Sequence, residues 1–230
     1  MRSWLMVAVL AISGLTTGCA VQVQNPVALA PAAIGPSAGK VGIAMTELPK
    51  VDTAFPGAGC LLCLGVANLA HSALNAHVST LSYEDLPELK NQAGQLIAQR
   101  GGQPVVLAEA FKFDGLEEFK TDKPNFARRD FRPLRAKHGV DKLLVVEVQA
   151  LGIWRNYASY VPTEPPKAVF NALAYMVNLQ DNSLEWYQPI AIRKAAETWD
   201  QAPKFPELTN AYFQALELGK DAVLKPLQAQ

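Results

Sequence analysis

The chain has 230 residues, half of which are hydrophobic, and its 21 Lys and Arg residues balance 21 Asp and Glu residues. A chain of this length and composition can bury one ordinary core, which excludes a largely disordered protein. The formal net charge of zero provides no field that would attract nucleic acid, so we expect no nucleic-acid partner.

The first residues combine a basic start with an apolar run. Arg2 precedes the run Trp4–Leu15, which ends at Thr16-Thr17-Gly18-Cys19. A membrane-spanning helix needs about 20 apolar residues, more than this run provides. The layout is therefore typical of a cleaved signal peptide, which we predict over residues 1–18.

The end of this leader, Leu15-Thr-Thr-Gly-Cys19, resembles the lipobox of bacterial lipoprotein precursors. The resemblance implies cleavage before Cys19 and acylation of that cysteine, so that membrane lipid becomes a partner of the chain. In the family, leucine usually stands three residues before the cysteine, where this chain has Thr16. Ala20, rather than aspartate, follows the cysteine, and by the same resemblance this favours the outer membrane, with the domain facing the periplasm.

The composition changes at Lys40. Residues 19–39 comprise Cys19 and a segment rich in Ala, Pro and Gln without periodicity, which we interpret as a flexible tether. Residues 40–228 are expected to form a single periplasmic domain. Its first predicted element is a short buried strand over Val41–Met45.

An apolar insertion rich in Gly and Leu occupies residues 55–80 and contains no Asp, Glu, Lys or Arg. It lacks the polar face that a soluble helix needs. Exposed apolar surface of this length usually marks an interface. The candidate interface residues are Leu61, Leu62, Leu64, Val66 and Leu69.

Cys60 and Cys63 are the remaining cysteines once Cys19 carries lipid. In an oxidising periplasm they are candidates for a disulfide, and two free thiols in an apolar wall are a second interpretation. With His71 and His77 they also contain the four ligand atoms of a zinc site, but the spacing between the two pairs is shorter than in common zinc fingers. Zinc is therefore the weaker alternative.

The rest of the chain alternates helix and strand signals. Ser82 opens a predicted helix that Gly101 and Gly102 end, and a short helix is expected before Gly139. A long helix is predicted to begin at Pro206, with one apolar face that runs from Leu208 to Val223 and packs on the sheet. The predicted strands after the insertion are 105–110, 141–150, 168–179 and 184–192.

This order predicts an α+β fold in which a mixed sheet ends in an antiparallel three-strand meander and the helices pack on one face. The segment Arg135–Val146, a helix followed by Gly139-Val140-Asp141 and a strand, resembles one step of a recurring family of envelope domains, as does the preceding Gly101-Gly102 turn. The family includes the amino-terminal domain of TolB, the curli-secretion lipoprotein and the lipoprotein activators of peptidoglycan synthases.

No predicted motif has the structural context that catalysis requires, so we expect no catalytic residues and no cofactor. The first hypothesis is a membrane-anchored lipoprotein that binds an envelope protein or associates with itself, as an accessory to an assembly, secretion or transport system. The alternative is a periplasmic lipoprotein that binds a small ligand, a glycan or a metal through the Cys/His segment or an aromatic loop.

Overall fold

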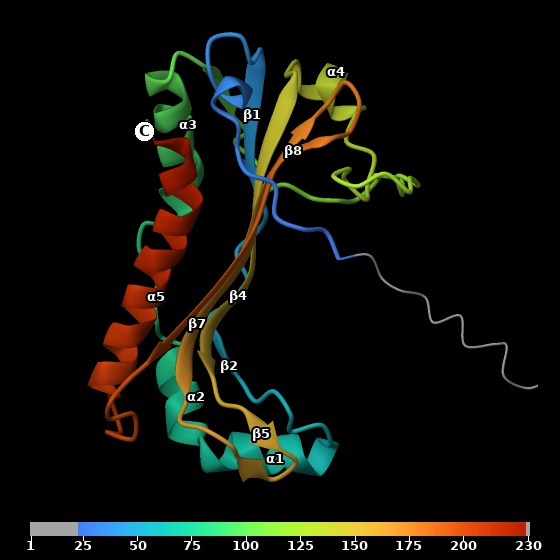
Figure 1. Ribbon diagram of the computed structural model, residues 1–230. Coiled ribbons are helices and arrows are strands. Elements are labelled where there is room, and N and C mark those ends of the chain that lie inside the picture. Colours follow the sequence, from blue (N-terminus) through green and yellow to red (C-terminus); the bar gives the residue numbers. More distant parts are fainter. Residues whose placement is uncertain (1–22, 229–230) are drawn as a thin grey trace, which may run out of the picture.

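The computed structural model describes residues 23–228, which form a single α+β domain built on one long sheet (Figure 1). The predicted signal peptide and Cys19 lie outside the described residues. The strands are β1 (Lys40–Met45), β2 (Asp52–Ala54), β3 (Gln103–Val106), β4 (Lys142–Trp154), β5 (Tyr157–Ala158), β6 (Val161–Pro162), β7 (Lys167–Asn178) and β8 (Leu184–Ala195). The helices are η1 (Pro31–Ala33), α1 (Leu61–Ala70), α2 (Ser72–Val78), η2 (Leu86–Glu88), α3 (Leu89–Gln99), α4 (Leu134–His138), α5 (Pro206–Leu224) and η3 (Lys225–Leu227).

The sheet has the strand order β3-β1-β4-β7-β8. β1 runs parallel to both β3 and β4, whereas β4, β7 and β8 form the predicted antiparallel meander. β2 pairs with the far end of β4, where Asp52 lies opposite Gly152. The mixed α+β sheet with its terminal meander is confirmed.

Helices α3 and α5 cover one face of this sheet, on the left in Figure 1. Their apolar side chains pack on alternate residues of the strands, including Phe170 and Trp186, which are fully buried. α5 approaches the sheet closely at Gly219, where a Cβ atom would lie 2.5 Å from the ring of Phe170. Lys220 of the same helix is bonded to Glu217 and to Asp85, which ties α5 to the segment before η2.

The other face is covered at one end by α4 and by the loop of residues 107–133. Phe131 and Leu134 pack there on Val145 and Tyr175 of the sheet. Gly139 ends α4 in the left-handed conformation with φ of 63°, which glycine adopts without the steric cost of a side chain, as the predicted helix stop requires.

Residues 23–39 differ from the predicted flexible tether. Val27 pairs with Tyr187 at the edge of β8, and its backbone N–H lies 2.9 Å from the Tyr187 carbonyl oxygen. η1 follows, and Ile34 is fully buried in the main core. The composition of this segment and its lack of periodicity suggested that it does not pack on the domain. Single apolar side chains such as Ile34 are nevertheless enough to hold an irregular segment on the domain surface.

At the opposite end of the sheet, α1, α2 and the β5–β6 hairpin project beyond the meander, at the bottom of Figure 1. The sequence did not predict helices in this insertion. Among the described residues no single helix is long and apolar enough to cross a bilayer, whereas α1 and α2 meet that test of length and composition as a pair bent by 77°.

Candidate functional site

The surface that we call the apolar tip consists of the exposed apolar side chains of α1 and the β5–β6 hairpin. On α1, Leu61 is 92% exposed and Leu69 is 78% exposed. All five predicted interface residues of α1 are exposed, and the hairpin adds two side chains that were not among those five. The members of the apolar tip are Leu61, Leu62, Leu64, Val66, Leu69, Tyr160 and Val161.

Helix α1 is fixed at its first turn by Cys60 and Cys63. The structure joins them in a disulfide, and the Cys60 sulfur accepts a hydrogen bond from the Cys63 N–H at 2.9 Å. Cys60 is therefore the amino-terminal cap of α1, a position usually filled by an oxygen-bearing side chain. Its sulfur also lies 3.6 Å from the Tyr160 hydroxyl oxygen, which brings the hairpin beside α1.

The inner side of α1 packs on a small core of its own. Cys63 and Ala67, one helical turn apart, are buried against Phe55 and Tyr157. Gly57 is required where the preceding loop meets β5, because its φ is 86° and a Cβ would come within 1.9 Å of the Tyr157 carbonyl oxygen. The leucines that surround this core are exposed because Cys63 and Ala67 already fill the single inward stripe of the helix.

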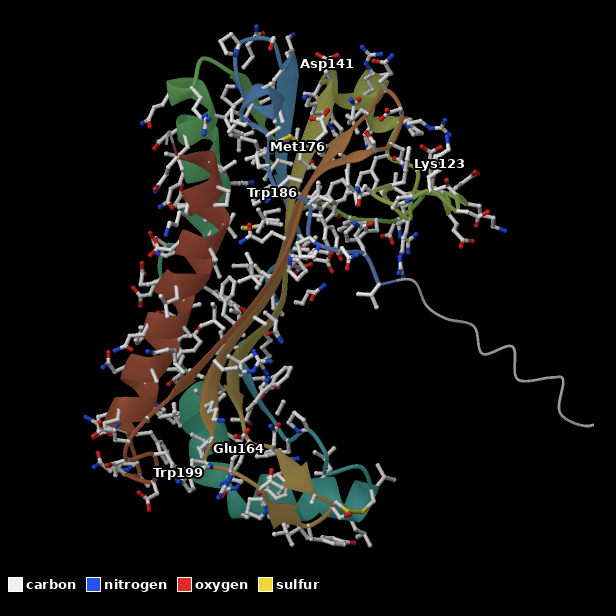
Figure 2. The ribbon with its side chains drawn as sticks, in the orientation of Figure 1. Lys123, Asp141, Glu164, Met176, Trp186 and Trp199 are labelled. Carbon is white, nitrogen blue, oxygen red and sulfur yellow. A yellow bond between two sulfur atoms is a disulfide. The ribbon has the colours of Figure 1, made fainter. Side chains whose placement is uncertain are left out.

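A polar and aromatic cluster connects the apolar tip to the sheet. The Nε2 atom of His71 lies 2.8 Å from the Tyr157 hydroxyl and 3.0 Å from the Arg155 guanidinium. Because Arg155 only donates hydrogen bonds, Nε2 carries no proton and accepts. Phe55 stacks on the His71 ring, and Arg155 lies over Trp199 with its guanidinium carbon 4.5 Å from the ring centre. Figure 2 labels Trp199 and Glu164, which both lie at the lower end of the sheet.

Burial, and secondarily the charge of Arg155, hold the pKa of His71 below its usual value of 6.5. Burial also lowers the pKa of His77, and together with the neighbouring Lys137 it lowers the pKa of His138. The unfolded chain therefore binds protons at these imidazoles at a higher pH than the folded chain does. By proton linkage, the folded state loses stability as the pH falls below about 6.5.

We predict that the melting temperature is lower at about pH 5.5 than at about pH 7.5. This difference should be smaller in a His71→Gln variant. Glutamine is chosen because its amide oxygen can still accept a hydrogen bond from Arg155. Asp130 and Asp141 do not contribute in this window, because their bonds to Arg132, and to Lys40 and Arg135, lower their pKa values below 3.8. Thermal unfolding measures the effect. Equal differences in both proteins would show that His71 is not one of the titrating groups.

The alternative zinc ligands are not brought together. Cys60 and Cys63 are joined to each other, His71 contacts Tyr157, and His77 lies 2.7 Å from the Thr209 hydroxyl. Among residues 23–228 no group of three or more His, Cys, Asp and Glu side chains is arranged to hold a metal ion. The zinc interpretation therefore has no support in this geometry.

A separate hollow of about 1140 Å³ lies between the sheet and the loop of residues 107–133, far from the apolar tip. It is open to the surface, and Gln24 and Asn25 at the start of the described chain line one side of it. The side chain of Gln24 donates to Asn125 at 2.9 Å. Lys123, labelled in Figure 2, belongs to the outer wall of this hollow. Its aromatic lining comprises Phe113, Phe119, Phe126, Phe131, Tyr175 and Tyr187.

Comparisons with known proteins give distant likenesses only. No family model matches the chain, and no curated relative matches it. A PelC dodecamer structure from Paraburkholderia phytofirmans is 10% identical, with coverage of 90% of this chain and 96% of that one and a TM-score of 0.34. Protein XCC0632 from Xanthomonas campestris, of the DUF330 family, is 12% identical, with coverage of 88% and 94% and a TM-score of 0.35.

Lipoprotein GNA1162 from Neisseria meningitidis is 12% identical, with coverage of 71% of this chain and 86% of that one and a TM-score of 0.26. With TM-scores this low, none of the three structures supports a conclusion about the activity or assembly of this chain. The resemblance to the TolB amino-terminal domain and its relatives stays a prediction carried by the step Arg135–Val146.

Proposed function

We propose that this chain is an envelope lipoprotein, anchored to the outer membrane through lipid on Cys19, that acts by binding rather than by catalysis. In this role it is an accessory to an envelope assembly, secretion or transport system. The observation that carries the proposal is the apolar tip, in which Leu61, Leu62 and Leu69 are each more than 70% exposed. Clustered exposed leucines of this kind are typical of binding surfaces.

Burial of the apolar tip against a partner would be strongly favourable. Covering one leucine side chain contributes about 1.5–3 kcal/mol, so three leucines supply several kcal/mol before the costs of association. The disulfide and the small core around Phe55 hold α1 in place, so little ordering is required when the tip binds. A preformed apolar surface is thus available in the described fold.

The lipid and the tip would act together. Only Ala20, Val21 and Gln22 separate Cys19 from Val23, the first described residue. A chain of this length spans at most about 14 Å, so an acylated Cys19 would keep the domain directly beside the membrane. The protein would therefore meet its partners at the membrane surface.

A Leu61→Ser, Leu69→Ser double variant should lose most of the contacts that chemical crosslinking detects in native envelopes, because it removes apolar area without touching the core. Leu218→Ser on α5, where Leu218 is 43% exposed, is the matched control and should retain them. Crosslinked products identified by mass spectrometry provide the readout, and equal melting temperatures confirm folding. Unchanged crosslinks to both protein and lipid in the double variant would contradict the proposal.

A small-ligand carrier is the second candidate, and the hollow lined by Phe119, Phe126 and Tyr187 favours it. A ligand in this hollow would raise the melting temperature of the wild type and of the double variant alike, because the site is far from α1. If a ligand bound at the tip instead, it would raise the melting temperature of the wild type but not that of the double variant.

A further inference from the structure

We infer that the apolar tip inserts into one leaflet of the membrane that holds the lipid anchor. This inference rests on the proposed binding function of the tip and names its partner as a lipid bilayer. The chain would then contact the membrane at two places, through the acyl chains at Cys19 and through α1.

Helix α1 lies in an uncharged stretch of the sequence. The sequence contains no Asp, Glu, Lys or Arg between Asp52 and Glu84, a stretch that includes the whole of α1 and α2. Protein interfaces are surrounded by a polar rim that commonly carries charged residues. A hydrocarbon phase excludes charge throughout, because each ionised side chain there costs several kcal/mol. The composition of the segment fits the bilayer better than a protein surface.

The exposed apolar face of α1 is wide. At about 100° per residue, the positions of Leu61, Leu62, Leu64, Val66 and Leu69 span about 200° of the helix circumference. A partner protein covers a narrower stripe, whereas lipid surrounds a helix from every free side. Asn68 is the polar exception, and its side chain donates to the Leu64 carbonyl at 2.9 Å.

From Leu64 onward, the backbone N–H groups of α1 are bonded within the helix. The helix forms its own bonds from the Leu64 N–H to the Cys60 carbonyl at 2.9 Å and onward to His71, whose N–H lies 3.1 Å from the Ala67 carbonyl. The Cys60 sulfur accepts from Cys63 in the first turn. Internal satisfaction of N–H and C=O groups is the condition for entering hydrocarbon.

The length of α1 and the charged residues next to the hairpin limit how deeply the tip enters the bilayer. Ten residues of helix are about 15 Å long, half the thickness of the hydrocarbon core, so α1 enters one leaflet and does not span. Tyr160, 51% exposed on the hairpin, lies beside Cys60 at the start of α1 and would enter together with that end of the helix. Charged side chains begin immediately behind it with Arg155, Glu164 and Lys167.

The two contacts lie far enough apart to orient the domain. The described chain starts beside Tyr187, and β8 continues from there to Ala195 at the end that carries the tip, a distance of about 26 Å at 3.3 Å per residue. In Figure 1 the first described residues and α1 both project on the side of the sheet opposite α3 and α5. The long axis of the sheet would therefore lie along the membrane.

The test uses the native lipidated protein in vesicles of phosphatidylethanolamine and phosphatidylglycerol with brominated acyl chains. A Leu62→Trp variant places a fluorescent probe on α1, and Leu218→Trp on α5 is the matched control. Emission of each variant is compared with that of the wild type, which contains native tryptophans. We expect blue-shifted emission and quenching by the brominated lipid for Leu62→Trp, and neither effect for Leu218→Trp.

Two outcomes would overturn the inference. Only the second would also reject the proposed binding function of the tip. Blue-shifted emission that depends on protein concentration, without quenching by brominated lipid, would show that a second copy covers the tip. The proposed binding function would then survive while the bilayer is rejected. Water-exposed emission of Leu62→Trp under all conditions, together with unchanged crosslinks in the double serine variant, would reject both.

Discussion

Replacing Asn182 by alanine is expected to lower the free energy of unfolding by about 3–5 kcal/mol, because it leaves several buried backbone groups without partners. Asn182 is fully buried. Its side-chain oxygen accepts from the Phe131 N–H at 2.9 Å, and its nitrogen donates to the carbonyls of Ala127 and Arg129 at 3.0 and 2.9 Å. Its φ of 71° adds strain for alanine, since asparagine tolerates the left-handed region better.

The loss should be concentrated in the loop that Asn182 holds on the sheet. Hydrogen exchange is expected to increase in residues 113–131 before the meander responds, because that loop depends on Asn182 for its buried backbone bonds. Ser183→Ala, which removes only a local bond to Asp181, is the control. Urea unfolding gives the free energies. A loss below about 1 kcal/mol for Asn182→Ala would mean that water replaces its three bonds.

Replacing Cys19 by alanine is expected to abolish acylation completely and to leave the precursor with residues 1–18 attached. The reason is chemical, because alanine has no thiol to receive the lipid. Incorporation of labelled palmitate and the amino-terminal sequence of the purified protein measure the two effects. Membrane fractionation alone does not suffice, since an uncleaved leader and the apolar tip would each retain the protein.

A double Cys60→Ser, Cys63→Ser variant is the control for this labelling experiment. It removes the disulfide from the tip and should still incorporate palmitate, because Cys19, the proposed site of acylation, is unchanged. Label retained in Cys19→Ala would place the acyl group elsewhere. Label lost in the control as well would show that the tip influences processing.

The regular part of the fold could be predicted from sequence because its signals are local. The alternation in β4 places Leu144 and Val146 on one face of the sheet and Leu143 and Val145 on the other. α3 ends before Gly101-Gly102, and α4 ends at Gly139, as the glycine positions indicated. Strand periodicity and helix-ending glycines can be recognised from neighbouring residues alone, without knowledge of tertiary contacts.

The irregular parts depend on contacts that are distant in sequence. Ile34 is buried under elements that follow it in the chain, so its own neighbours gave no indication that residues 23–39 pack on the domain. The helix α1 was not predicted because its pattern lacks a polar face, and its structure depends on Phe55 and Tyr157. The four leucines and one valine predicted as interface residues are exposed, as the sequence suggested, whereas Tyr160 and Val161 join them through the fold of the hairpin.

The central claim is that the apolar tip is the surface with which the anchored protein binds. A photoreactive amino acid at position 62, compared with the same residue at position 218 on α5, tests it in intact cells. The account predicts adducts from position 62, with lipid as the principal product, and few from position 218. An absence of adducts from position 62, with the protein folded and anchored, would contradict it.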